Sequence, residues 1–231
     1  MKRIILPLFF VLTLISCASR IDGSLAADGS AFVNLNISFE PRMTALIRSF
    51  SQAGGQAGGP VLNGPAIAQS MSAAPGVIYA VFRNISDSAI EGQVRISHVN
   101  NFLSASGMSF ITFEQGSQGG RCVININLNN GPAIIPLFSQ EIKEYLEAFL
   151  APLVTGERLT RSQYLDEVAV FYNRTISNEI ASSRIIVSID FPGTITGVRG
   201  GLFSGRRANF DIPLLDLLVL ETPLSYEVTW N

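Results

Sequence analysis

The spacing of apolar and polar residues predicts strands, then helices, then strands again. Apolar and polar positions alternate over residues 32–39, 90–98 and 122–129, which gives each segment one apolar and one polar face. Residues 77–82 are apolar throughout, and residues 108–113 form a further predicted strand. Such alternation is typical of antiparallel strands in a sheet that is covered on one face.

Two mid-chain segments have the apolar spacing of amphipathic helices. The first can be capped by Ser139, and its apolar residues fall on one stripe as far as Leu153. The second begins with Thr160 and Gln163, a pair that fits a capping box, and is predicted to continue as one helix to about residue 183. We expect both helices to cover one face of the sheet.

A strand is predicted again at residues 185–191. A Gly-rich hairpin follows at 197–205, and the last predicted strand covers 224–230. This order predicts a single α+β domain over residues 31–231, mostly an antiparallel sheet with the two helices packed on one face. Residues 51–76 have a Gly-rich centre, and they are predicted to form a long flexible loop within that domain.

The N-terminus resembles the export signal of bacterial lipoproteins. Residues 1–3 are basic after the Met, and residues 4–15 are an uninterrupted apolar run. That run is shorter than the about 20 residues that cross a bilayer, but it suits a signal peptide. Residues 14–17, Leu-Ile-Ser-Cys, are similar to a lipobox: aliphatic, variable, small, then Cys.

The lipobox resemblance implies that residues 1–16 are removed and that Cys17 carries fatty acyl chains, which anchor the chain to a membrane. It also implies a bacterial cell-envelope location, either periplasmic or surface-facing. An ordinary signal peptide that contains a Cys is the alternative. Asp-Gly-Ser sequences at 22–24 and 28–30 favour turns, so residues 17–30 are predicted to be a lipidated tether.

Composition narrows the remaining function classes. A chain of 231 residues that is 47% hydrophobic is not disordered, and 16 basic against 18 acidic residues do not indicate a nucleic-acid partner. Cys122 lies in an apolar strand pattern and is predicted to be a small core residue. We predict no metal site, no cofactor and no enzyme activity. A hydrolase using His98, the only histidine, is the less favoured alternative.

Two short segments are candidate contacts with lipid. The first concentrates three basic residues in nine positions, which either contact anionic headgroups or form a solvated turn. The second is the apolar run at 214–220, which either is buried core or forms an apolar lip that touches a lipid or the membrane. The candidate residues are Arg199, Arg206, Arg207, Leu214, Leu215, Leu217 and Leu218.

The order of segments is also similar to LppM-type envelope lipoproteins over most of residues 28–231. The similarity consists of the Asp-Gly-Ser start, the mid-chain helices, Phe-Pro-Gly at 191–193 and a closing strand that ends in Trp230. It implies an α+β domain that binds lipid at the cell envelope. We therefore expect a non-enzymatic, membrane-anchored lipoprotein that binds a lipid or another apolar envelope ligand in a sheet–helix cleft. The alternative is a structural or assembly lipoprotein that docks another envelope protein through residues 51–76 or an exposed sheet edge.

Overall fold

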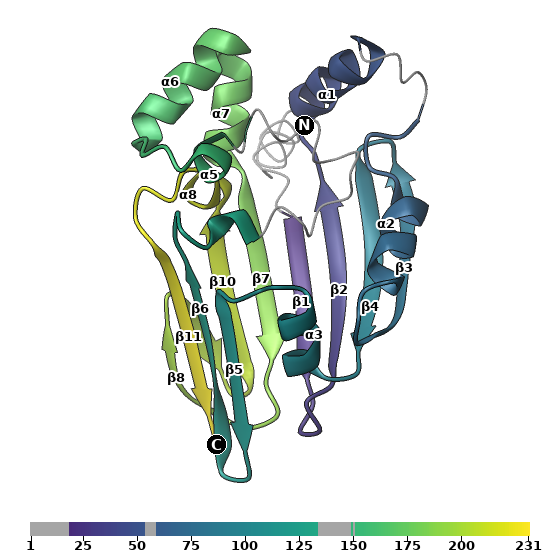
Figure 1. The fold of residues 1–231 in the computed structure, drawn as a ribbon, viewed down its shortest axis with the longest axis vertical. Coiled ribbons are helices and arrows are strands. Elements are labelled where there is room, and N and C mark those ends of the chain that lie inside the picture. The colour runs from purple at the N-terminus through teal and green to yellow at the C-terminus, as the bar shows by residue number, and fades with distance from the viewer. Residues whose placement is uncertain (1–18, 54–58, 134–148, 150) are drawn as a thin grey trace, which may run out of the picture.

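The structure, a computed structural model, describes residues 19–53, 59–133, 149 and 151–231. Its strands form two sheets (Figure 1). Their bounds are β1 Ser19–Leu25, β2 Ala31–Ser38, β3 Val77–Ser86, β4 Ala89–Ile96, β5 Ile111–Gly116, β6 Gly119–Ile126, β7 Arg184–Asp190, β8 Ile195–Arg199, β9 Leu202–Ser204, β10 Arg207–Pro213 and β11 Leu224–Trp230.

Sheet A has seven strands in the order β3-β4-β2-β1-β7-β10-β9, and sheet B has four in the order β5-β6-β11-β8. The pairing of β1 with β7 is parallel, whereas the other pairings in both sheets are antiparallel. The predicted α+β class with mostly antiparallel sheets is therefore confirmed.

The helices lie in two groups. Figure 1 shows α2 and α3 against the strands, whereas α1, α5, α6, α7 and α8 gather at one end of the sheets. Their bounds are α1 Pro41–Ala53, α2 Gly64–Ser72, α3 Val99–Ala105, α5 Ala151–Thr155, α6 Arg161–Phe171, α7 Arg174–Ser182 and α8 Leu214–Val219.

The inner face of sheet A, which we define as the face toward sheet B, carries the core. Phe210 on β10 meets Tyr226 on β11 edge to face, with ring centroids 5.4 Å apart, and so joins the two sheets. The predicted apolar row of β4 is confirmed, because Ile90, Val94 and Ile96 are all buried. Beside them, the ring of Phe82 fills the space above Gly92.

The predicted tether at 17–30 is wrong for residues 19–25, which form β1 between β2 and β7. The Asp-Gly-Ser at 22–24 lies inside this strand, because Asp22 is held by Arg20 and Arg207 and Gly23 lies beside Ile189. Only the second Asp-Gly-Ser makes a turn, where the Asp28 carboxylate accepts a hydrogen bond from the Ser30 N–H.

The predicted flexible loop at 51–76 is also wrong over part of its length, because residues 64–72 form α2. Asn63 caps this helix by accepting a hydrogen bond from the Ala66 N–H at 3.2 Å, and Pro65 stands in its first turn. Leu62, just before the cap, is 1% exposed and anchors the segment in the core. The centre of the predicted loop, residues 54–58, lies outside the described residues.

The mid-chain helices differ from the prediction in where they end. The capping box of Thr160 and Gln163 is confirmed. However, α6 ends at Phe171, and α7 begins with Asn173, whose side chain accepts a hydrogen bond from the Ile176 N–H. Asn side chains compete for backbone donors in this way, which favours a new helix start over continuation. The helix predicted after Ser139 lies largely outside the described residues.

The packing of Phe82 on Gly92 makes Gly92 a sensitive position. We expect Gly92→Ala to lower the free energy of unfolding by about 1–3 kcal/mol, because the added methyl group would overlap the ring. Gly116→Ala is the control, since a Cβ there would lie 3.8 Å from the Gly119 carbonyl oxygen, an ordinary contact. Urea unfolding followed by circular dichroism measures both. Equal midpoints for the two variants would contradict this account.

Candidate functional site

The inner face of sheet A is less buried at its centre than on its flanks. On the flanking strands the inner-face residues Ile90, Val94 and Phe210 are buried. On the central strands β2, β1 and β7 the larger apolar inner-face residues are only half-buried, although central strands are the farthest from the sheet edges. We call this set the inner apolar band: Ile21, Val33, Leu35, Ile37, Val187 and Ile189.

Sheet B contributes further half-buried apolar residues on its own inner face, namely Cys122 and Ile124 on β6. Burial raises the pKa of the Cys122 thiol to about 11, so the group is protonated at neutral pH. A protonated, partly buried thiol behaves as a small apolar residue. The inner faces of both sheets are thus apolar, as the alternation in the sequence predicts.

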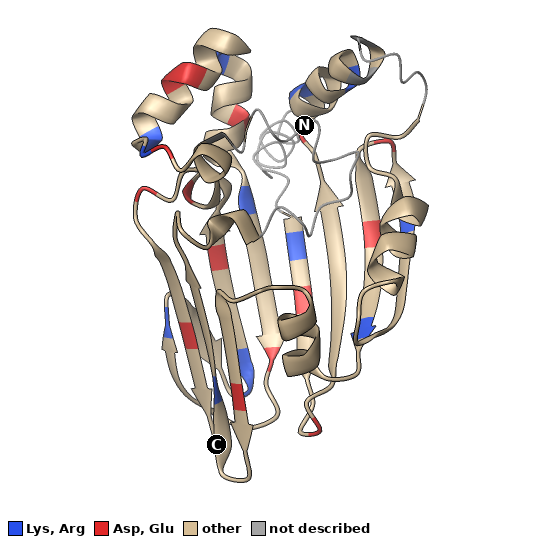
Figure 2. Ribbon diagram, viewed as in Figure 1, with Lys and Arg blue, Asp and Glu red and all other residues tan. Residues whose placement is uncertain are grey.

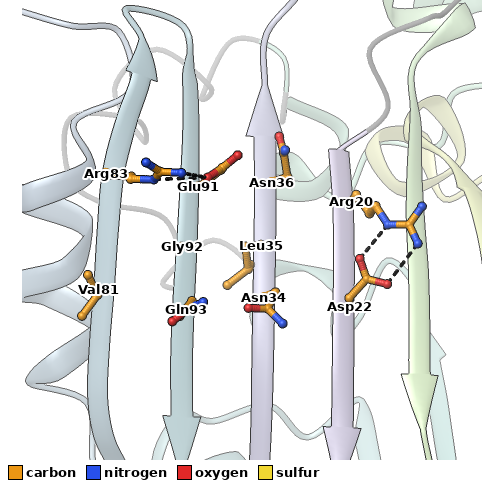
Figure 3. Close-up of a pocket in the computed structure, with 10 residues that line it drawn as sticks. All are labelled: Arg20, Asp22, Asn34, Leu35, Asn36, Val81, Arg83, Glu91, Gly92 and Gln93. Carbon is orange, nitrogen blue, oxygen red and sulfur yellow. Dashed lines mark hydrogen bonds and ion pairs between the residues drawn. The ribbon is translucent and has the colours of Figure 1, made fainter.

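The outer face of sheet A, opposite the inner apolar band, carries a polar groove of about 510 Å³ (Figure 3). Two ion pairs border it, Arg20 with Asp22 and Arg83 with Glu91, each at 2.6 Å. Three amide side chains lie between these pairs. They are Asn34, Asn36 and Gln93. Because the lining contains two arginines and two carboxylates, the groove carries balanced charge and does not select one sign of ligand.

Neither this groove nor a smaller cavity beside α3 and β5 is the predicted apolar cleft between helices and sheet. The smaller cavity is lined by residues of 100–113, Leu103 and Phe113 among them. The feature that comes nearest to the expectation is the inner apolar band.

The predicted basic cluster is dispersed in the structure. Arg199 on β8 pairs with Glu227 at 3.0 Å, and Arg207 on β10 pairs with Asp22 and Asp190 at 2.7 and 3.2 Å. The Arg206 guanidinium donates to the Phe191 carbonyl oxygen at 2.8 Å. Figure 2 shows residues of both signs interspersed over the sheets. Closeness in sequence therefore did not produce a free basic surface, and contact of these arginines with a membrane stays a prediction.

The predicted apolar run at 214–220 forms α8, which packs into the core. Leu215 and Leu218 are buried, while Leu214 and Leu217 are half-buried against the core cluster. Leu215 and Leu218 therefore follow the buried-core interpretation and are not part of a surface lip. An ion pair between Asp216 and Arg161, at 2.9 Å, also joins α8 to α6.

Three exposed apolar surfaces were not predicted from the sequence: the end of α6, the edge strand β3 and the edge strand β9, where Leu202 and Phe203 are 79% and 48% exposed. Val170 and Phe171 at the end of α6 are 81% and 77% exposed. On the edge strand β3, Ile78, Val81 and Ile85 are exposed as well. The first surface had a signal in the sequence, because Val170 and Phe171 fall off the apolar stripe that the helix spacing assigns to the core.

Within the described ranges, no group of three or more His, Cys, Asp or Glu side chains is placed to hold a metal ion. His98 lies two residues after the end of β4 and is the N-cap residue of α3. Among the described helices, none has the length and hydropathy needed to cross a bilayer.

The described residues define an α+β domain of one mixed and one antiparallel sheet. No protein-family model matches the chain, and no curated protein matches it. A search of solved structures returned the NMR structure of the folded domain of Mycobacterium tuberculosis LppM. That match has a TM-score of 0.42 and 9% sequence identity, and covers 93% of this chain and 88% of that one. So weak a likeness says nothing about what this chain binds.

The Asp22 carboxylate joins β1 to β10 across β7, because it pairs with Arg20 on its own strand and with Arg207 on β10. The hydrogen bond from Arg20, aided by Arg207, holds the pKa of Asp22 below its ordinary value of 3.8. A carboxyl group with a lowered pKa stabilises the fold above its unfolded pKa, and this contribution is lost as pH falls through the folded pKa.

We expect Asp22→Asn to lower the free energy of unfolding at pH 7 by up to about 1 kcal/mol, as is usual for partly exposed ion pairs. The difference from the natural chain should shrink as pH falls below 3.8. Urea unfolding over a pH series measures it. The control is Asp166→Asn, at an exposed position of α6. A difference for Asp22→Asn that does not change with pH would show that the ion pairs are not its cause.

Proposed function

We propose that this chain is a non-enzymatic, lipid-anchored protein of the bacterial cell envelope, and that it holds a lipid or another apolar ligand against the inner apolar band. The observation that carries the proposal is the half-buried state of Leu35, Ile37 and Val187 in the middle of sheet A. Apolar side chains at the centre of a sheet are normally among the most buried in a domain. An apolar occupant would complete their burial.

A fatty acyl chain suits this surface. The inner-face residues of the three central strands are apolar over several successive positions, and a linear chain can lie across them without meeting a charge. Each methylene removed from water contributes about 0.8 kcal/mol, so even part of an acyl chain gives useful affinity.

The anchor is supported by the lipobox at 14–17 and by the position of β1. Ser19, the first residue of β1, lies two positions after Cys17. Because a chain extends at most about 3.6 Å per residue, this end of sheet A would lie within about 7 Å of the Cys17 backbone. An anchored domain would therefore stand directly on the bilayer, where apolar ligands are supplied.

Mass spectrometry of the full chain, purified from bacterial membranes in detergent, tests both parts. Denaturing spectra should show a chain that begins at Cys17 and carries acyl groups. Native spectra should show additional mass that solvent extraction removes and identifies as a lipid. An acylated chain without bound lipid would contradict the proposal that the domain binds a lipid, and would support the proposed anchor.

Gly23→Val tests where the ligand lies. A Cβ on Gly23 would meet Ile189 and the Phe32 carbonyl oxygen at ordinary distances of 3.6–3.9 Å, so Val should fit while occupying space beside the inner apolar band. We expect at least a several-fold loss of bound lipid with unchanged thermal stability. Ser24→Val, at the next position and on the outer face, is the matched control and should retain the lipid. Equal lipid in both variants would exclude this surface.

A second function, docking of another envelope protein, is favoured by the edge strand β3. Edge strands that expose apolar side chains are ready to pair with a further strand, and Ile78, Val81 and Ile85 are all exposed here. We infer an extended segment of an envelope protein as the partner, because an added strand would satisfy the free edge.

A photo-crosslinking residue at Val81, in intact bacterial cells, tests this docking. We expect one discrete adduct with a second protein. The same residue at Val154, an exposed apolar position on helix α5 and not on a sheet edge, is the control and should give none. Adducts of equal yield at both positions, or none at Val81, would contradict docking at β3.

A further inference from the structure

The turn between α6 and α7 presents two large apolar side chains to solvent. We call Val170 and Phe171 the α6–α7 tip; they are 81% and 77% exposed. The residues that follow, Tyr172 and the cap Asn173, complete the turn into α7. Two adjacent, almost fully exposed apolar residues at one extremity of a domain need an explanation beyond the scattered exposure found on most surfaces.

The tip is held firmly by its neighbours. The Tyr172 ring packs edge to face on Phe50 of α1 and lies 4.9 Å from the Phe149 ring, measured between centroids. The Tyr164 hydroxyl, in turn, donates a hydrogen bond to the Phe149 carbonyl oxygen at 2.9 Å. Because aromatic contacts and caps fix the turn, Val170 and Phe171 are displayed by a rigid support and not by a fraying helix end.

The tip lies at the end of the molecule where β1 begins. The chain leaves α7 directly into β7, and Ile185 in β7 pairs with Ser19. At the same end, the Glu179 carboxylate of α7 accepts hydrogen bonds from the backbone N–H groups of Arg42 and Met43 in α1. Figure 1 shows α6, α7 and α1 together at this end of the sheets.

The length of α7 and the reach of the chain before Ser19 together decide whether the tip can contact the bilayer. The nine residues of α7 span about 13 Å, at 1.5 Å per residue, and separate the tip from the start of β7. Cys17 extends at most about 7 Å beyond Ser19. Helix α7 is therefore longer than the segment between Cys17 and Ser19. A bilayer that holds the acyl chains of Cys17 would then contact the tip as well.

We propose that the α6–α7 tip inserts Val170 and Phe171 into the interfacial layer of the phospholipid bilayer that holds Cys17, as a second contact that orients the domain. This inference rests on the anchor of the proposed function. Moving the Phe and Val side chains from water into the interfacial layer is favourable in free energy. The exposed Arg174 beside them can reach headgroup phosphates. The domain would then point sheets A and B, and the hairpin of Arg206, away from the membrane.

Fluorescence quenching by lipids tests this orientation. The full acylated chain, carrying either V170C or L202C labelled with nitrobenzoxadiazole, is placed in vesicles of phosphatidylethanolamine and phosphatidylglycerol that contain brominated lipid. The two positions are matched in exposure, 81% and 79%, and β9 is separated from β1 by β7 and β10 in sheet A. Cys122 is protonated and partly buried, so it should label slowly.

We expect brominated lipid to quench the label at 170 several-fold more than the label at 202. We also expect Phe171→Ser to speed the transfer of the acylated chain between vesicles about tenfold, and Leu202→Ser to leave it unchanged. Equal quenching at both positions, or a label at 170 shielded by a second protein chain and not by lipid, would overturn the inference while leaving the anchor intact. A mature chain without acyl mass on Cys17 would overturn both.

Discussion

The parallel pairing of β1 with β7 is the constraint on which the rest of the structure depends. It places the first strand of the chain in the middle of sheet A, beside a strand that comes about 165 residues later. Asp22 reinforces this pairing across β7 through Arg207 of β10. With β1 fixed there, anything attached before Ser19 has a defined place at one end of the sheets. The inferred anchor and the exposed tip of α6 and α7 thereby come to share one end.

Sheet A separates two environments by the alternation of its side chains. On the outer face, arginines and carboxylates lie beside one another and neutralise each other around a polar groove. On the inner face, the flanks are closed by α2 on one side and by sheet B on the other. The central strands between these two supports retain half-buried apolar residues, and this is the observation behind the proposed apolar ligand.

The two ends of the molecule, along the direction of the strands, also differ from each other. One end carries α1, α5, α6, α7, α8 and the start of β1 (Figure 1), and the other carries the turn between β9 and β10, where Arg207 pairs with Asp190 at the end of β7. Arg206 and Arg207 are each engaged within the protein, the first by a backbone carbonyl and the second by two carboxylates. The α6–α7 tip and the start of β1 share the helical end, and this shared position is what gives the domain its proposed direction relative to a membrane surface.

The sequence by itself determined those features that depend on near neighbours. Alternation predicted β2, β4 and β6 and which side of β4 and β6 is apolar, and Thr160 with Gln163 predicted the start of α6. The tertiary structure decided everything that required a distant partner. The Asp-Gly-Ser at 22–24 favours a turn locally, but strand pairing on both sides outweighs that preference. Leu215 is buried because other elements cover it, and Arg199 pairs with a glutamate on another strand, Glu227, which also pairs with Arg121. Such partners are brought together by strand order, which spacing along the chain does not encode.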